Sequence, residues 1–273
     1  MSDTFPVTAG YYQQFDADYS LDHPGEGYGG WRSATIDLSR SHTALVVMHA
    51  WSNATYDTYP AGWHAVEYIP RSSRIMEEVF PPLLSAVRGS GLRVYHVVAQ
   101  GANYFKDCPG YQQTLAITPA TERPVGVEAD PTLEKLSTFH GDHGFPGKHN
   151  QPQIREHFRS GIDFGPNSRP LGDEPVCEDA DQLTAVCRRD GVNHLVYVGF
   201  AINWCLLKSP GGMVDMSRRG AMCSTIRQAV TAVENKETCR DELCKQVALW
   251  RVALAFGYVF DLDDFIAAVR RQA

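Results

Sequence analysis

The sequence predicts an α/β protein with three layers (α/β/α), in which helices cover both faces of a central, mostly parallel sheet of about six strands. Short apolar runs rich in β-branched residues recur at 43–48, 92–98 and 194–199, and each has the length of a buried strand. Segments with helical spacing lie between these runs, and such alternation is typical of a parallel sheet covered on both faces. With right-handed crossovers, we expect the three strands to lie centrally and side by side.

The segments around the first two strands differ in regularity. Residues 1–40 are rich in Tyr, Asp and Gly with little periodicity, and we expect an arm or lid that lies on the body or on a neighbouring subunit. Apolar residues from Ile75 to Val87 predict a helix that Pro81-Pro82 interrupts. Residues 100–175 show no sustained period and are expected to form an irregular insertion in a domain spanning 41–273.

Regular patterns return in the second half of the chain. Asp179, followed by Gln182, resembles the start of a helix that Gly191 ends. A short strand is expected over 221–226, and Asp261 is expected to cap a last helix. A long helix is predicted by an apolar stripe, formed by Leu243, Val247, Trp250 and Leu254.

Composition excludes several classes of function. The net charge of −7 argues against a nucleic-acid surface, which needs clustered Lys and Arg. No apolar run approaches the ~18 residues of a membrane span, and the N-terminus has no signal-peptide pattern. The seven cysteines include no CxxC pair. We therefore expect a cytoplasmic protein with reduced thiols, no cofactor, no metal and no membrane partner.

The apolar run that ends at Gly199 is followed, six residues later, by Cys205. This places Cys205 at the carboxyl end of a strand, where open α/β sheets bind ligands. A helix-like segment begins there, and the positive end of its dipole would favour a nucleophilic thiolate. The alternative is a buried structural thiol. The other six cysteines are interpreted as structural.

Four segments in the same order resemble the isochorismatase-like cysteine hydrolases. The likeness covers roughly residues 40 to 270, and the segments that carry it are Ala44-Leu-Val-Val-Met-His-Ala-Trp51, Pro82 to His96, Gly191 to Cys205, and Phe256-Gly-Tyr-Val-Phe-Asp-Leu-Asp-Asp-Phe. The resemblance implies a hydrolase that acts on a C–N bond other than a peptide bond, in a small amide- or imide-like substrate. Its nucleophile would be Cys205.

The resemblance also implies an Asp as base, a Lys that assists, and backbone N–H groups that bind the oxyanion. The position of the Asp is taken by His49, and an imidazole can deprotonate a thiol. Lys148 is the predicted assisting lysine, and Ala201-Ile202 occupies the turn that often holds a cis peptide in this family. The alternative is a relative without activity that binds a ligand or serves as an assembly subunit.

Further residues are predicted around this site. Aromatic and polar side chains could line the substrate pocket, namely Trp51, Trp63, His64 and Trp204. Trp51 and Trp63 could equally pack on the N-terminal arm. His140, His143 and His149 predict a solvated loop, with metal binding as the alternative. The aromatic arm also predicts a homo-oligomer, through residues Tyr11, Tyr12, Phe15, Tyr19, Tyr28 and Trp31.

Overall fold

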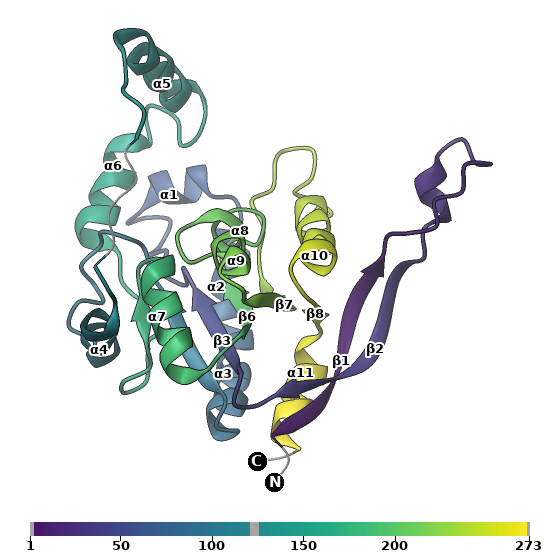
Figure 1. Cartoon of the computed structure of the whole chain (residues 1–273). Coiled ribbons are helices and arrows are strands. Elements are labelled where there is room, and N and C mark those ends of the chain that lie inside the picture. Colours follow the sequence, from purple (N-terminus) through teal and green to yellow (C-terminus); the bar gives the residue numbers. More distant parts are fainter. Residues whose placement is uncertain (1–2, 121–125, 272–273) are drawn as a thin grey trace.

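A computed structural model, which describes residues 3–120 and 126–271, shows an eight-stranded sheet with helices on both faces (Figure 1). The strand order is β2-β1-β8-β7-β6-β3-β4-β5. The strands are β1 (Thr4–Gln13), β2 (Gly30–Ser39), β3 (Thr43–Met48), β4 (Arg93–Val97), β5 (Val176–Cys177), β6 (His194–Gly199), β7 (Met222–Val230) and β8 (Val259–Phe260). Strands β3 to β8 are parallel. The sheet therefore has eight strands rather than about six.

Strand β3 lies between β4 and β6, which confirms the predicted central neighbours. All six residues of β3 are buried, because both faces of the strand are covered by helices. Ala44, Val46 and Met48 pack into one core, whereas Leu45 and Val47 pack into the other. Because alternate side chains of β3 enter the two cores, this strand packs against the helical layers on both faces of the sheet.

The helices are divided between the two faces of the sheet. One core joins the sheet to a π-helical turn (Ile75–Val79), α3 (Phe80–Gly89) and α11 (Leu262–Arg270). The other joins it to α7 (Ala180–Asp190), α8 (Cys205–Lys208), α9 (Met213–Arg218) and α10 (Leu243–Ala255). The remaining described helices are α1 (Pro60–Ala65), α2 (Ile69–Arg74), α4 (Pro109–Ile117), α5 (Pro131–His143) and α6 (Gln151–Glu156), with single turns at Pro24–Gly27 and His157–Gly161.

Several helix boundaries follow the predicted signals. Asp179 accepts a hydrogen bond from the N–H of Gln182, and Gly191 ends α7 at φ 70°. The predicted interruption is present as the π-helical turn before α3, and Pro81-Pro82 stand in the first turn of α3 itself. The strand expected over 221–226 is longer and extends to Val230. Asp261 stands at the start of α11 but makes no capping bond with its side chain.

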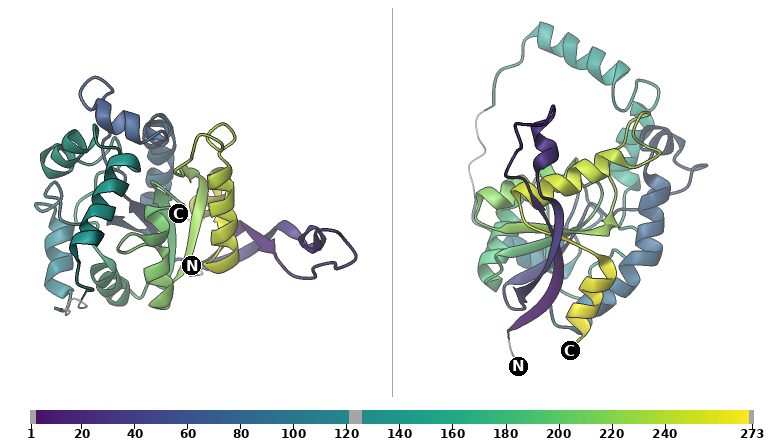
Figure 2. Two further views of the ribbon diagram at one scale, coloured as in Figure 1. Left: turned by 90° about the horizontal axis from the view of Figure 1, so that it is seen from above. Right: turned by 90° about the vertical axis from the view of Figure 1, so that its right-hand side faces the viewer.

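The N-terminal segment contains regular structure that its composition did not predict. Strands β1 and β2 form an antiparallel hairpin, and β1 joins the sheet by pairing with β8. Its distal end projects away from the body beyond α10 (Figure 2). The alternating burial of Phe5, Val7 and Ala9 in β1 is the period of a half-buried strand.

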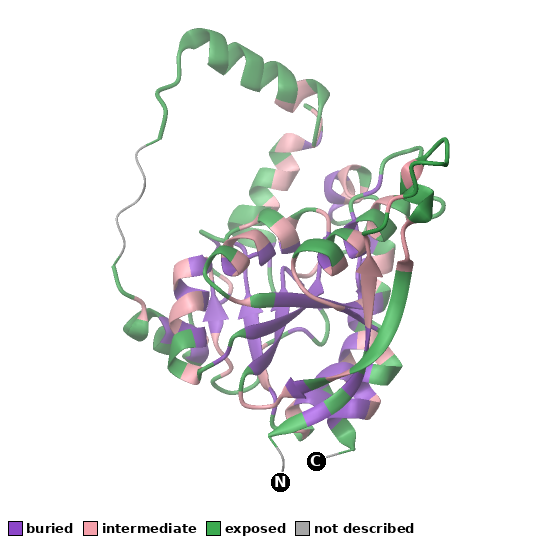
Figure 3. Cartoon of the chain, turned by 45° about the vertical axis from the view of Figure 1, so that its right-hand side comes forward, coloured by how far each residue is buried: buried purple, intermediate pink, exposed green. Residues whose placement is uncertain are grey.

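Residues 100–175, expected to be irregular, contain α4, α5, α6 and the start of the segment leading to β5. Helix α5 stands away from the sheet, and most of its residues are exposed (Figure 3). No helix in the described part of the chain has the length and apolar content required to cross a membrane.

Candidate functional site

The turn between β6 and α8 is held by close backbone contacts. A Cβ on Gly199 would lie 1.9 Å from the carbonyl oxygen of Met48, and the φ of Gly199 is +123°. Only glycine fits there, because the ends of β3 and β6 approach so closely. The peptide bond that follows, Phe200–Ala201, is cis. It lies one residue before the predicted Ala201-Ile202 position.

Three backbone hydrogen bonds hold the loop that leads to Cys205. The Ala201 carbonyl accepts the N–H groups of Trp204 (3.1 Å) and Leu206 (3.0 Å). The N–H of Ile202 donates to the carbonyl of Thr231 at 2.7 Å, which ties the loop to the end of β7. Because this donor is occupied, Ile202 cannot offer it to an oxyanion, and the prediction for Ile202 needs correction.

The Cys205 thiol is half-buried at the carboxyl edge of the parallel sheet. Burial raises the pKa of this thiol, while the Ser209 side chain, the Ala201 N–H and the Lys208 charge act in the opposite direction. The helix dipole was expected to favour the thiolate, but burial is the largest effect and raises the pKa of the thiol on balance. Helix α8 has only four residues.

His49 follows β3 directly and is buried. Its backbone N–H donates to the carbonyl of Val97 at 2.9 Å, and its φ is 52°. Burial lowers the pKa of the ring to about 4, against a smaller opposing effect of the Val98 backbone. The imidazole is therefore neutral at pH 7, and its Nδ1 has no hydrogen-bond partner among the described residues. Among the residues that the structure describes, no hydrogen bond joins His49 to Cys205.

Two lysines differ in their relation to the thiol. Lys148 is 80% exposed and its Nζ lies 3.6 Å from a carboxylate oxygen of Asp142. Lys208 follows Cys205 by three residues on α8, and its Nζ lies 3.5 Å from the ring centroid of Trp204. Its charge lowers the pKa of Cys205. Sequence reasoning missed Lys208, although residues three apart on a helix are neighbours.

The predicted pocket side chains occupy different surroundings. Trp51 lies beside His49, with ring centroids 4.8 Å apart, and also contacts Phe158. On α1, the indole N–H of Trp63 donates to the Asn53 carbonyl at 3.2 Å. The exposed His64 bonds the Tyr56 hydroxyl, and Trp204 is 47% exposed at the start of α8. Trp51 and Trp204 are thus the predicted tryptophans that adjoin His49 and Cys205.

Tyr68 is an additional group near the thiol. It stands immediately before α2 and is partly buried. Burial raises the pKa of its hydroxyl, and negative charge on Cys205 and Glu67 would raise it further. The hydroxyl therefore stays protonated at neutral pH and can act as a hydrogen-bond donor. No pattern in the sequence identifies this position.

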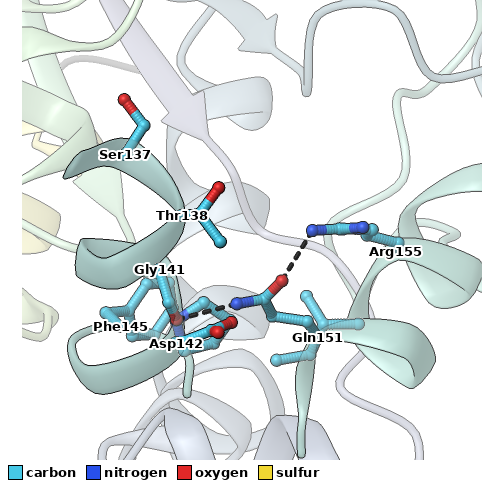
Figure 4. Close-up of a pocket in the computed structure, with 9 residues that line it drawn as sticks. Ser137, Thr138, Gly141, Asp142, Phe145, Gln151 and Arg155 are labelled. Atoms are coloured by element: carbon cyan, nitrogen blue, oxygen red, sulfur yellow. Dashed lines mark hydrogen bonds between the residues drawn. The ribbon is translucent and has the colours of Figure 1, made fainter. Parts of the chain in front are cut away.

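A pocket of about 510 Å³ lies away from these residues, between α5 and α6 (Figure 4). Gln151 joins its two sides, since its amide donates to the Gly141 carbonyl at 2.7 Å and its oxygen accepts from Arg155 at 2.6 Å. His143 on α5 stacks on Phe139. Within residues 3–120 and 126–271, no group of three or more His, Cys, Asp and Glu side chains is arranged to hold a metal ion.

Comparison with known proteins identifies the fold. No protein-family model and no curated sequence matches the chain. A cysteine hydrolase from Pseudomonas syringae pv. phaseolicola 1448A has a similar structure, with a TM-score of 0.52 at 13% identity over 86% of this chain and 96% of that chain. The chain therefore has the fold of the isochorismatase-like cysteine hydrolases, as its sequence motifs predicted.

Two more distant structures were also found. An isochorismatase-like hydrolase from Alkaliphilus metalliredigens has a TM-score of 0.47 at 16% identity, over 83% of this chain and 97% of that one. N-carbamoylsarcosine amidase from Thermoplasma acidophilum has a TM-score of 0.43 at 17% identity, over 81% of this chain and 97% of that one.

Proposed function

We propose that the protein is a cysteine-dependent hydrolase of a small amide- or imide-like substrate, with Cys205 as the nucleophile. The observation that carries this proposal is the place of Cys205, at the first residue of α8 and the carboxyl edge of the parallel sheet. Ligands bind at this edge in open α/β sheets. The similar structure from Pseudomonas syringae is itself described as a cysteine hydrolase.

The raised pKa of the thiol means that catalysis needs a base. His49 is neutral at pH 7, so its ring can accept a proton. Since no hydrogen bond joins His49 to Cys205 in this structure, we assign the transfer to a different His49 rotamer or to a bridging water. The protonated His49 would then return the proton to the leaving nitrogen.

The reaction then follows the chemistry of an acyl-enzyme. The thiolate forms a C–S bond with the substrate carbonyl carbon, and the resulting oxyanion accepts hydrogen bonds from the N–H groups of Ala201 and Cys205. The C–N bond breaks and the amine leaves with the proton from His49. Water attacks the thioester, which releases a carboxylic acid and restores the thiol.

Lys208 replaces Lys148 as the assisting lysine in this proposal. Its charge acts on the Cys205 sulfur, whereas Lys148 is bound to Asp142 at the surface. The exposed Trp204 ring under the Lys208 ammonium and the Trp51 ring beside His49 are the proposed walls for a flat substrate. Trp63 and His64 remain predictions for the substrate pocket.

A ligand-binding relative without activity is the second candidate. It is favoured by the missing His49–Cys205 hydrogen bond and by the pKa of about 4, which makes His49 a weak base. In that case the protein would bind the same class of small molecule at the same edge and release it unchanged.

The two candidates are separated by a turnover and trapping experiment. The wild-type protein, Cys205→Ala and Cys239→Ala are incubated with a panel of small amides and imides, with ammonia or amine release and intact mass as readouts. The hydrolase proposal expects turnover and a thioester adduct on wild type and Cys239→Ala, and neither on Cys205→Ala. Cys239 is an exposed thiol and serves as the matched control. Binding without turnover across the panel would favour the second candidate.

We further propose a cytoplasmic homo-oligomer. All seven cysteines are free thiols, which supports a reducing compartment. Its expected partners are the small-molecule substrate and further copies of the chain, with no nucleic acid and no membrane.

A further inference from the structure

Helix α10 presents an apolar stripe to solvent. Leu243, Val247 and Leu254 are exposed, with 56% of Val247 accessible. They lie four and seven residues apart, which places them on one face of the helix. They belong to the apolar stripe that predicted this long helix. The buried face is the opposite one, formed by Ala248, Leu249 and Val252.

A shallow pocket of about 300 Å³ adjoins this stripe. It lies between α8 and α10 and is lined by Asn203, Leu207, Thr238, Leu243, Cys244, Val247, Ala248 and Arg251. Most of these side chains are apolar. The stripe and the pocket together form a larger apolar surface than isolated exposed side chains would, and such patches mark protein interfaces.

The N-terminal hairpin flanks the same surface. Its base packs on α10, because the Trp250 indole donates to the side-chain oxygen of Gln14 at 2.9 Å and stacks edge-on to Tyr12. Beyond this contact the hairpin leaves the body (Figure 2). The distal residues Phe15, Tyr19 and Leu21 are exposed, with 87% of Tyr19 accessible. Exposed apolar side chains therefore occur both on α10 and on the distal part of the hairpin that packs against it.

The two sides carry opposite charges. Every charged residue between 14 and 29 is acidic: Asp16, Asp18, Asp22 and Glu26. On α10, the charged residue beside the apolar stripe is Arg251, whereas Lys245 lies on the opposite, partly buried side of the helix near Glu242 and Glu234. Arg251 is exposed and lies over the Trp250 ring. Because the acidic tip is held away from its own α10, these charges would meet in a complex between two copies.

We propose that a second copy of this chain docks on α10, with the two apolar stripes in contact about a two-fold axis and each hairpin tip reaching the α10 of its partner. A two-fold interface brings the same patch together with itself, so each copy supplies both the acidic tip and the exposed Arg251. The acidic tip would be repelled by anionic lipid and by nucleic acid, which favours a protein partner.

The proposal is tested by molar mass in solution, measured by light scattering and analytical ultracentrifugation. Wild type should have twice the mass of the 30.3 kDa chain. Val247→Glu should shift the protein to monomer, because a charge would be buried in the apolar contact. Leu136→Glu is the matched control, since Leu136 is an exposed apolar residue on α5. Circular dichroism verifies that each variant is folded.

A charge exchange tests the pairing of tip and helix. Asp22→Arg combined with Glu26→Arg should weaken the dimer at least tenfold, and so should Arg251→Glu. All three substitutions together should restore most of the affinity. A monomeric wild type, or a dimer that Leu136→Glu disrupts and Val247→Glu does not, would overturn the proposal. A dimer that Val247→Glu disrupts but that all charge variants leave intact would overturn the role of the tip.

Discussion

The sulfur of Cys205 is subject to opposing effects on its pKa. Burial raises it, whereas Ser209, the Ala201 N–H and Lys208 lower it, and burial is the larger effect. The resting protein therefore holds a thiol rather than a thiolate at neutral pH, and reactivity in the proposed reaction depends on proton removal.

We predict that alkylation of Cys205 by iodoacetamide is slow at pH 7 and rises as the pH passes above 9. Lys208→Gln should move this profile to higher pH and lower the rate at pH 8 by a few-fold, because the thiolate loses a nearby positive charge. Mass spectrometry of the Cys205 peptide gives the rate. Lys236→Gln is the control, since Lys236 is exposed and paired with Glu237. Rapid labelling at pH 7 would contradict the protonated resting state.

The proposed role of His49 as the base can be tested by measuring turnover. His49→Ala should lower kcat by roughly 10²- to 10⁴-fold with little change in KM, as expected for loss of a general base. His23→Ala is the matched control, because His23 is an exposed histidine of the N-terminal hairpin and has no proposed part in the site. Equal kcat values for His49→Ala and wild type would assign the proton transfer to another group.

At the scale of elements, features set by neighbouring residues could be predicted from the sequence. Features set by packing between distant segments could not. The strands at 43–48 and 194–199 are continuous apolar runs, and α7 has both its cap and its terminal glycine. In α10, apolar residues occupy both faces, so periodicity could not say which face is buried. Strands β5 and β8 have two residues each, too few for any pattern.

The residues of the candidate site also divide into those that the local sequence predicted and those that packing between distant segments positions. The carboxyl end of β6 predicted the place of Cys205, and the end of β3 predicted that of His49. Lys208 and Tyr68 depend on how α8 and α2 pack around the thiol, which is decided by contacts distant in sequence.

The contact between the ends of β3 and β6 gives a prediction at this scale. Gly199→Ala should destabilise the protein by about 3 kcal/mol or more, because the new Cβ would overlap the Met48 carbonyl at a positive φ. Urea denaturation measures the loss. Gly89→Ala is the control, since a Cβ there meets no atom within 4 Å, and it should be neutral or slightly stabilising. Equal stability of both variants would show that the two strand ends can separate.

For the whole molecule, buried histidines predict a loss of stability in mild acid. Burial lowers the pKa of His96, against an opposing hydrogen bond to Glu174. Burial lowers the pKa of His49 and of His194 to about 4, and His194 shares a 2.7 Å hydrogen bond with the buried Ser224 hydroxyl. Below a pH of about 6.5 the unfolded chain binds protons that the folded chain does not, so the free energy of unfolding decreases as pH falls toward 4. At pH 5 His49 and His194 should each remove about 2 kcal/mol relative to pH 7.5.

Urea denaturation at pH 7.5, 6.0 and 5.0 measures this loss. His194→Gln should reduce the loss between pH 7.5 and pH 5.0 by about 2 kcal/mol. The effect of the Glu174 carboxylate on stability can be told from that of the histidines, because it falls in a lower pH range. Although burial alone would raise its pKa, bonds from His96 and Arg88 lower it to about 2, so its contribution is lost only below pH ~4.5. If wild type has the same free energy of unfolding at pH 7.5 and pH 5.0, these histidines bind protons in the folded protein as readily as in the unfolded chain, and burial does not lower their pKa values.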